Sequence, residues 1–145
     1  MSDVLKTTPL DALNRELGGR MVPFAGYSMP VQYQAGILSE HLHCRAAAGL
    51  FDVSHMGQAT LAGPGAVAAL EALTPTDVAS LKPGRQRYSL LLTPEGTILD
   101  DFMVARIGAE ELFLVVNAGC KEADFAHIAA NLPEGTTLPA TRTVR

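Results

Sequence analysis

The first third of the chain alternates between two helical patterns and one apolar segment that is rich in proline and glycine. Three leucines at helical spacing predict a short helix over residues 9–17, which begins at a proline and ends at Gly18. Residues 34–48 carry a second helical pattern, with Gly49 as its expected end. Residues 21–33 lie between them and hold too many prolines and glycines for a helix, yet too many apolar side chains for a solvated loop. We therefore expect this segment to pack against another part of the protein.

After residue 56 the pattern changes to short strands with two helices among them. Apolar runs and period-two alternation predict the strands, and the turn-forming residues from Thr93 to Gly96 predict a hairpin. The predicted elements are strands at 58–61, 85–92, 97–106 and 112–116, helices at 64–73 and 120–131, and a last strand-like stretch that ends at Arg145.

The short connections between successive strands indicate the fold class, because strands joined by tight turns must pair antiparallel. We predict an α+β fold with an antiparallel sheet of about five strands that carries two helices on one face. This α+β domain, in the order βαβββαβ, is expected to span residues 57–145. Residues 1–56 are expected to form the helical N-terminal segment of an incomplete first domain, since two short helices cannot close a core alone.

Composition and charge exclude several classes of protein. Of the 145 residues, 48% are hydrophobic and 18% are charged, which excludes intrinsic disorder. The formal net charge of -4 gives no general attraction to phosphate backbones, so we expect no nucleic-acid partner. No run approaches the roughly 20 apolar residues that cross a bilayer, so we expect no membrane partner. The first residues resemble neither a signal peptide nor a transit peptide, which favours a cytoplasmic location.

Two adjacent acids, Asp100 and Asp101, stand in the middle of an apolar strand. Aspartate is depleted in strands, and an unpaired buried carboxylate costs several kcal/mol, so the pair needs a reason. Adjacent strand residues point to opposite faces, so the two acids cannot form a shared acid–base dyad. In one interpretation both are hydrated near a strand edge or pair with Arg85 or Arg87 across the hairpin. In the other, a single carboxylate is held against the amine nitrogens of a ligand.

Other polar residues are predicted to have structural roles. His41, His43 and Cys44 with His55 could supply metal ligands. Positions 41 and 43 diverge on a helix and no spaced second pair exists, so we predict no metal site. Asn117 follows an apolar strand and precedes a helix, where a helix N-cap is the common role. Tyr88 is expected to pack on the sheet with its hydroxyl at the rim.

Two short motifs are also assigned to local structure. Residues 50–56 gather an acid, a hydroxyl and an imidazole within four positions, whereas a catalytic triad converges from distant segments, so a local hydrogen-bonded corner is predicted. Residues 63–68 match a dinucleotide-binding fingerprint, but the acidic residue expected about 20 positions later is absent. This second motif is therefore interpreted as the start of a helix.

Four segments in order resemble one known family. They are residues 21–30, residues 49–56, Tyr88-Ser89 followed by residues 96–101, and residues 115–118. Together they resemble the N-terminal part of the aminomethyltransferase, the T-protein of the glycine cleavage system. The resemblance covers essentially the whole chain, which makes it more specific than any single motif.

The resemblance implies a fold, a reaction and a set of site residues. Family members are three-domain, cloverleaf-like proteins that bind tetrahydrofolate as cosubstrate. They take an aminomethyl group from the lipoyl arm of the partner H-protein, release ammonia and form 5,10-methylenetetrahydrofolate. By its place in the Asp-Asp pair, Asp101 corresponds to the catalytic aspartate of the family. The resemblance implies folate-binding positions at Tyr88, Asn117, Met56 and Val115, with the 50–56 corner lining the pterin cavity.

The chain also departs from the family pattern. Pro23 and Tyr27 stand where many members have aspartate and tryptophan, and members run to more than twice this length. We expect the missing C-terminal half of the enzyme to supply further folate contacts, and this chain alone to show weak or no turnover. Two alternatives stay open. One is a related folate-binding module, like those of sarcosine and dimethylglycine dehydrogenases or iron-sulfur assembly proteins, and the other is a non-catalytic interaction domain.

Overall fold

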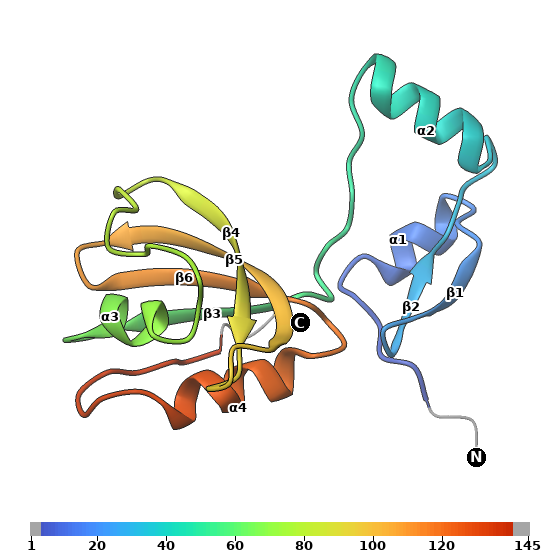
Figure 1. Cartoon of the computed structure of the whole chain (residues 1–145). Helices are drawn as coiled ribbons and strands as arrows, with labels where there is room; N and C mark the ends of the chain where they lie inside the picture. The colour runs from blue at the N-terminus through green and yellow to red at the C-terminus, as the bar shows by residue number, and fades with distance from the viewer. Residues whose placement is uncertain (1–3, 141–145) are drawn as a thin grey trace. The chain divides into compact units, whose positions relative to one another are not determined.

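The computed structural model describes residues 4–140, which divide into two compact units at the His55–Met56 junction. The first unit holds α1 (Asp11–Glu16), β1 (Met21–Phe24), β2 (Tyr27–Pro30) and α2 (Ile37–Ala46). The second unit holds β3 (Gly57–Ala62), α3 (Ala66–Glu71), β4 (Gln86–Leu92), β5 (Ile98–Gly108), β6 (Glu111–Val116) and α4 (Lys121–Ala130), as Figure 1 shows. Among the described residues, no helix is long and apolar enough to cross a membrane.

The second unit is a four-stranded antiparallel sheet in the order β3–β6–β5–β4. Alternate side chains of every strand are buried on one face, where α3 and α4 cover the sheet (Figure 1). Leu70 of α3 and Ile128 of α4 are fully buried there in one cluster with Leu112 and Leu114 of β6. Each such side chain stabilises the fold by roughly 1.5–3 kcal/mol. The predicted α+β class and antiparallel pairing are therefore confirmed, and the other face of the sheet has no helix of this unit over it.

The sheet has four continuous strands in the described range, where about five were predicted. The fifth position, beside β3, is held by two isolated bridges, Ala62 to Thr137 and Ala59 to Ala140. Thr137 exchanges both backbone hydrogen bonds with Ala62, at 2.8 and 2.9 Å. Pro139 accepts from the Thr60 N–H at 3.2 Å but has no N–H to return, so the ladder is interrupted there. The rest of the predicted last stretch, residues 141–145, lies outside the described residues.

The first unit differs from the prediction of two helices joined by an irregular segment. Part of that segment is a regular hairpin, in which β1 pairs antiparallel with β2. Its two-residue turn has positive φ at both positions, 48° at Ala25 and 81° at Gly26, which matches the twist of paired strands. Pro23 fits in β1 because the Ser28 N–H opposite it points away and donates to the Lys6 carbonyl at 2.8 Å. No ladder hydrogen bond is therefore required from the Pro23 nitrogen.

Gly57 at the start of β3 allows α4 to approach the sheet closely. A Cβ at this position would lie 2.6 Å from the Cβ of Lys121 and 2.6 Å from a methyl carbon of Val116. We predict that Gly57→Ala lowers the free energy of unfolding by about 1–3 kcal/mol, because the helix must shift to make room. Urea denaturation followed by circular dichroism measures the change. Gly119→Ala is the matched control, since a Cβ there meets nothing within 4 Å. Equal stability of the two variants would contradict the close approach.

Candidate functional site

The residues that the sequence singled out for folate binding lie together on the open face of the second unit. Tyr88 of β4 pairs with Met103 of β5, which in turn pairs with Val115 of β6. Asp101 is two residues from Met103 and so points to the same side, opposite the buried Phe102. Asn117 and Met56 directly follow and precede the paired residues Val116 and Gly57 at the end of the β3–β6 ladder. The strand register thus brings Tyr88, Asp101 and Val115 to one face of the sheet, and Met56 and Asn117 adjoin the end of the β3–β6 ladder.

Two side-chain donors converge on the Asp101 carboxylate. The Tyr88 hydroxyl donates to Oδ2 of Asp101 from the neighbouring strand β4. The amide nitrogen of Asn117 donates to Oδ1 of Asp101 and to its backbone carbonyl, each at 3.1 Å. The carboxylate is therefore held from both sides, while the Tyr88 side chain that holds it is 64% exposed. Arg87, which one interpretation paired with the acids, instead donates to the Asp77 carbonyl at 2.8 Å.

Asn117 links the two adjacent acids although they leave β5 on opposite faces. The same amide nitrogen that donates to Asp101 lies 3.0 Å from Oδ1 of Asp100. The interpretation of Asn117 as a helix N-cap is wrong, because α4 begins after Cys120 and has no side-chain cap. Asparagine at this place in a sequence is typical of a cap, and only the β5–β6 register shows that its amide reaches the aspartates.

Asp124 of α4 completes the polar cluster on the helix side of the sheet, and sequence reasoning missed it. Its side chain is buried, with 4% of its surface exposed, and its carboxyl group is within hydrogen-bonding reach of the Asp100 carboxyl. Burial, followed by the negative charge and hydrogen bond of Asp100, raises the pKa of Asp124 to about 7. A signal was present in the sequence, because Asp124 lies four residues before the inward-facing Ile128 and so shares its helix face.

Tyr88 also has a shifted pKa. The hydrogen bond to Asp101, partial desolvation and the charges of Asp101 and Asp100 together raise the pKa of the Tyr88 hydroxyl above 10.0. Tyr88 therefore stays protonated and acts as a donor at neutral pH. This agrees with the expected place of the hydroxyl at the rim of the sheet, and it adds a partner that the sequence did not indicate.

The predicted hydrogen-bonded corner before β3 is confirmed within the first unit. The Thr8 hydroxyl donates to Asp52 at 2.7 Å, and the Ser54 N–H donates to the same carboxylate at 3.0 Å. Burial raises the pKa of Asp52, but the hydrogen bonds from Ser54 and Thr8 outweigh it and hold the pKa below its usual value. The corner residues 50–55 belong to the first unit, whereas Met56 belongs to the second.

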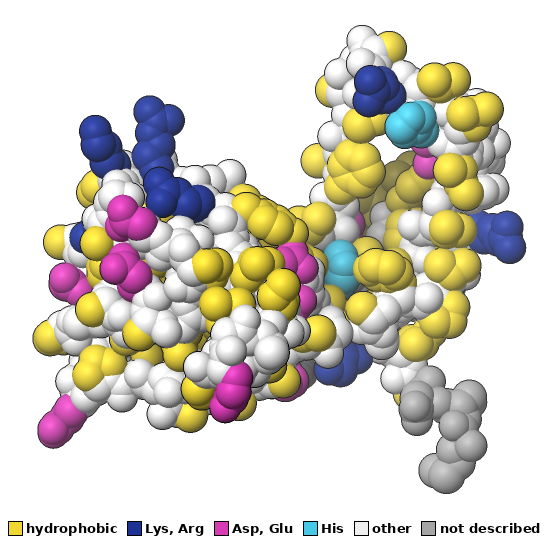
Figure 2. Space-filling model, viewed as in Figure 1, with side chains coloured by type: hydrophobic (Ala, Val, Ile, Leu, Met, Phe, Trp, Pro, Cys, Tyr) yellow, Lys and Arg dark blue, Asp and Glu magenta, His cyan; other side chains and the backbone are white. Residues whose placement is uncertain are grey.

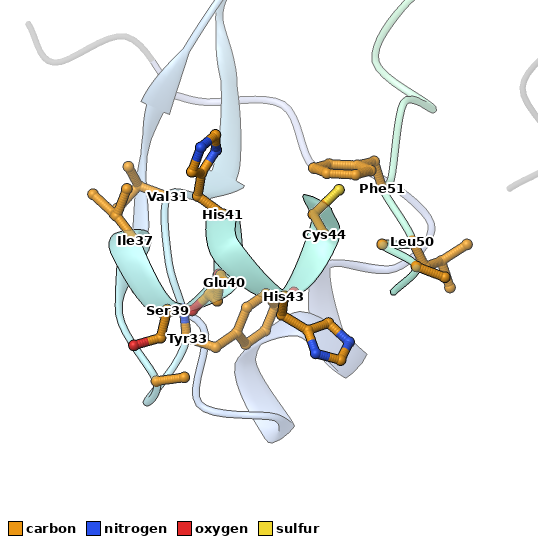
Figure 3. A pocket seen from close by; sticks show the side chains of 13 residues that line it. Val31, Tyr33, Ile37, Ser39, Glu40, His41, His43, Cys44, Leu50 and Phe51 are labelled. Atoms are coloured by element: carbon orange, nitrogen blue, oxygen red, sulfur yellow. Dashed lines mark hydrogen bonds between the residues drawn. The ribbon is translucent and has the colours of Figure 1, made fainter. Parts of the chain in front are cut away.

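The first unit also has a hollow of about 770 Å³ beside α2, shown in Figure 3. Its lining includes Ile37 and Cys44 of α2 together with Leu50 and Phe51 of the segment that follows. Figure 2 shows that hydrophobic side chains gather over the surface of this unit. Leu50 and Phe51 belong to the 50–56 corner that the resemblance places at the pterin cavity, whereas Met56, Tyr88, Asp101, Val115 and Asn117 do not line this hollow.

The fold and the open-face carboxylate define the second unit as an α+β domain with a polar site at the end of its sheet. A family described as the GCVT N-terminal domain matches residues 10–144. The chain is 43% identical over 143 residues to the mitochondrial aminomethyltransferase of Dictyostelium discoideum, covering 99% of this chain and 35% of that protein. It is 51% identical over 122 residues to the mitochondrial aminomethyltransferase of Gallus gallus, covering 84% of this chain and 31% of that protein.

A solved structure shows the same fold. The crystal structure of the glycine cleavage system aminomethyltransferase T from Bartonella henselae matches with a TM-score of 0.91 and 43% identity, over 95% of this chain and 38% of that chain. The chain therefore belongs to the aminomethyltransferase family and corresponds to its N-terminal domain, as the resemblance implied. It spans about a third of the length of the relatives it matches.

The Tyr88–Asp101 contact can be tested by titration. We predict that Asp101→Asn lowers the pKa of Tyr88 toward 10.0, because the variant lacks the negative charge that stabilises the protonated phenol. Absorbance of the tyrosinate form measures the titration, and Tyr88→Phe identifies the contribution of Tyr88 among the three tyrosines. Asp77→Asn is the control and is expected to leave the titration unchanged. An unchanged Tyr88 titration in Asp101→Asn would refute the contact.

Burial of Asp124 predicts a pH-dependent stability. The folded protein holds the Asp124 proton up to about pH 7, whereas the unfolded chain releases it near 3.8, the ordinary pKa of an aspartate. The contribution of Asp124 to the free energy of unfolding is therefore fully present below the pKa of the unfolded chain and is lost as pH rises toward 7. Within this window the free energy of unfolding falls by up to about 1.4 kcal/mol per pH unit. Urea denaturation across this window measures it, and Asp124→Asn is expected to remove that component. Identical pH profiles of the two proteins would contradict the buried proton.

Proposed function

We propose that this chain supplies the Asp101 side of the folate site in an aminomethyltransferase. The reaction transfers an aminomethyl group from the lipoyl arm of an H-protein to tetrahydrofolate, with release of ammonia and formation of 5,10-methylenetetrahydrofolate. Membership of the aminomethyltransferase family supports this reaction. The structural likeness to a glycine cleavage system protein supports the H-protein as partner.

The observation that carries the proposal is the pair of donors that converge on Asp101. Hydrogen bonds from Tyr88 and Asn117 fix the carboxylate in place, on a face of the sheet that α3 and α4 leave open. A carboxylate held in this way accepts from an amine nitrogen of the substrate and orients it for attack. It also stabilises the positive charge that develops on the transferred carbon as ammonia leaves.

The strip beside the carboxylate suits a flat, partly apolar ring. Tyr88, Met103 and Val115 follow one another across three strands, and Met56 lies at the end of the neighbouring ladder. A pterin resting on this strip would have its nitrogen atoms near Asp101 and Asn117, and the exposed ring of Tyr88 beside it. We therefore propose Tyr88, Asn117, Met56 and Val115 as folate contacts and Asp101 as the catalytic residue.

The chain covers about a third of each relative, so it holds part of the proposed site. Cosubstrate sites are usually concave and bury most of their ligand, whereas this open face covers one side of it. We propose that the remaining part of the enzyme covers the other side of the folate. The 145-residue chain alone is then expected to turn over weakly or not at all.

A second candidate is a folate-binding module that serves a different donor. The same open-face geometry would hold a reduced folate whichever protein delivers the one-carbon unit. Use of an aminomethylated lipoyl donor distinguishes the two functions. The interaction-domain alternative draws support from the exposed apolar side chains of the first unit, such as Leu38 at 70% and Leu50 at 99% exposure.

The decisive variant is Asp101→Asn in a complete enzyme. The 145-residue chain would replace the matched region of the Bartonella henselae protein, and the chimera would be assayed for 5,10-methylenetetrahydrofolate formation from aminomethylated H-protein. We predict that Asp101→Asn lowers kcat by about 10²–10³-fold, because the developing positive charge loses its anionic partner. Calorimetry with tetrahydrofolate checks that the variant still binds its cosubstrate.

Asp77→Asn provides the matched control, since Asp77 is an acid of the same type that caps a local turn by accepting from the Ser80 N–H at 2.9 Å. Its turnover is expected to stay within twofold of the parent chimera. A fully active Asp101→Asn chimera would contradict the catalytic role. Folate binding without turnover in the parent chimera would favour the module that serves another donor.

A further inference from the structure

We propose that Asp124 is a positioning residue, which donates a hydrogen bond from its protonated carboxyl group to Asp100 and thereby fixes Asn117 against the catalytic Asp101. The inference rests on the proposed function, because that function makes Asp101 the catalytic residue. The contacts among Asp124, Asp100 and Asn117 belong to this chain and can be tested without the reaction.

Two buried carboxyl oxygens lack any hydrogen-bond donor among the described residues. Oδ2 of Asp100 and Oδ2 of Asp124 are both inaccessible to solvent and accept no hydrogen bond there. The two carboxyl groups are nevertheless within hydrogen-bonding reach of each other. Two ionised carboxylates in this position would repel, and each would be an uncompensated buried charge. One shared proton removes both problems, because a protonated carboxyl group has an O–H to donate.

The contacts and burial of the two acids indicate which of them holds the proton. Oδ1 of Asp100 accepts from the Asn117 amide at 3.0 Å, a contact that favours an acceptor. Asp124 is buried at 4% exposure, and burial first of all raises its pKa to about 7. Asp124 is therefore the donor of the pair and Asp100 the acceptor.

A continuous path of side chains leads from Asp124 to the site. In the proposed arrangement the Asp124 carboxyl group donates to the Asp100 carboxylate. Oδ1 of Asp100 accepts from the Asn117 amide, which also donates to Oδ1 of Asp101. The path crosses from the helix face of the sheet to its open face through one asparagine side chain. Loss of the Asp124 proton would place a second negative charge beside Asp100 and weaken the hold on Asn117.

Other titratable groups around the pair come from three elements. Asp101 of β5 and Tyr88 of β4 lie on the open face, and the Cys120 thiol precedes α4. The charge of Asp100, followed by desolvation, a hydrogen bond to Asp100 and the charges of Asp124 and Asp101, raises the pKa of Cys120, so this thiol is neutral at pH 7. Along α4 are Lys121, Glu122 and His127, and Nε2 of His127 lies 3.1 Å from the Leu92 carbonyl oxygen.

The structural test uses the 145-residue chain and needs no substrate. Nuclear magnetic resonance would follow the side-chain amide of Asn117 as pH changes. We expect its resonances to move in a single step centred near pH 7, the pKa of Asp124, and to lose that step in Asp124→Asn. Asparagine at 124 can still donate to Asp100 but does not titrate. Asn117 resonances that do not move, or that move identically in the variant, would overturn the proposal.

The functional test uses the chimera with the Bartonella henselae protein. Asp124→Leu is expected to lower kcat about 10²-fold, the loss that follows when a reacting group is misplaced by about 1 Å. In the wild-type chimera, kcat is expected to fall as pH rises through about 7, because Asp124 loses its proton. Asp124→Asn is expected to keep most of the activity and not to show this fall. Wild-type kcat and an unchanged pH profile in both variants would overturn the positioning role. If the wild-type chimera itself is inactive, the proposed function fails, while the Asn117 titration still decides the inference.

Discussion

The side-chain amide of Asn117 is the contact on which the site depends. Adjacent residues of a strand point to opposite faces, so Asp100 and Asp101 would have no common partner within β5. Asn117 follows the neighbouring strand and reaches both, with its nitrogen about equally far from an oxygen of each acid, at 3.0 and 3.1 Å. One small side chain thus joins a buried polar cluster under α4 to an accessible carboxylate on the other face. Without it, Asp101 would be held by Tyr88 alone among its described side-chain contacts.

The elements of the second unit could be predicted from the sequence because local patterns determine them. Alternating side chains in β4, the tight turn after it and the apolar run of β6 each agree with the observed sheet. In β5 the two adjacent aspartates do not fit the apolar strand pattern around them. This mismatch correctly indicated the position of the candidate site. The contacts of Asn117 with both acids could not be assigned from local pattern, because they depend on strand register. The helical spacing of Asp124 indicated its inward face, but its neighbour Asp100 depends on helix packing. The same limit applies to the hairpin of the first unit, where Ala25 takes a positive φ that alanine rarely adopts.

The two units differ in how much of their apolar surface they bury. The second has a closed core between its sheet and α3 and α4. In the first, α2 has no buried residue, and Ile37, Leu38 and Leu42 are all more than half exposed. The first unit therefore exposes more apolar surface than the second.

A crystal structure of the chimera with bound tetrahydrofolate would show where the pterin lies. We expect it on the open face of the β3–β6–β5–β4 sheet, with a folate nitrogen about 3 Å from an oxygen of Asp101. We also expect Asn117 to keep its contacts with both aspartates. A pterin bound elsewhere, for example in the hollow beside α2, with Asp101 facing only solvent, would contradict the proposed site.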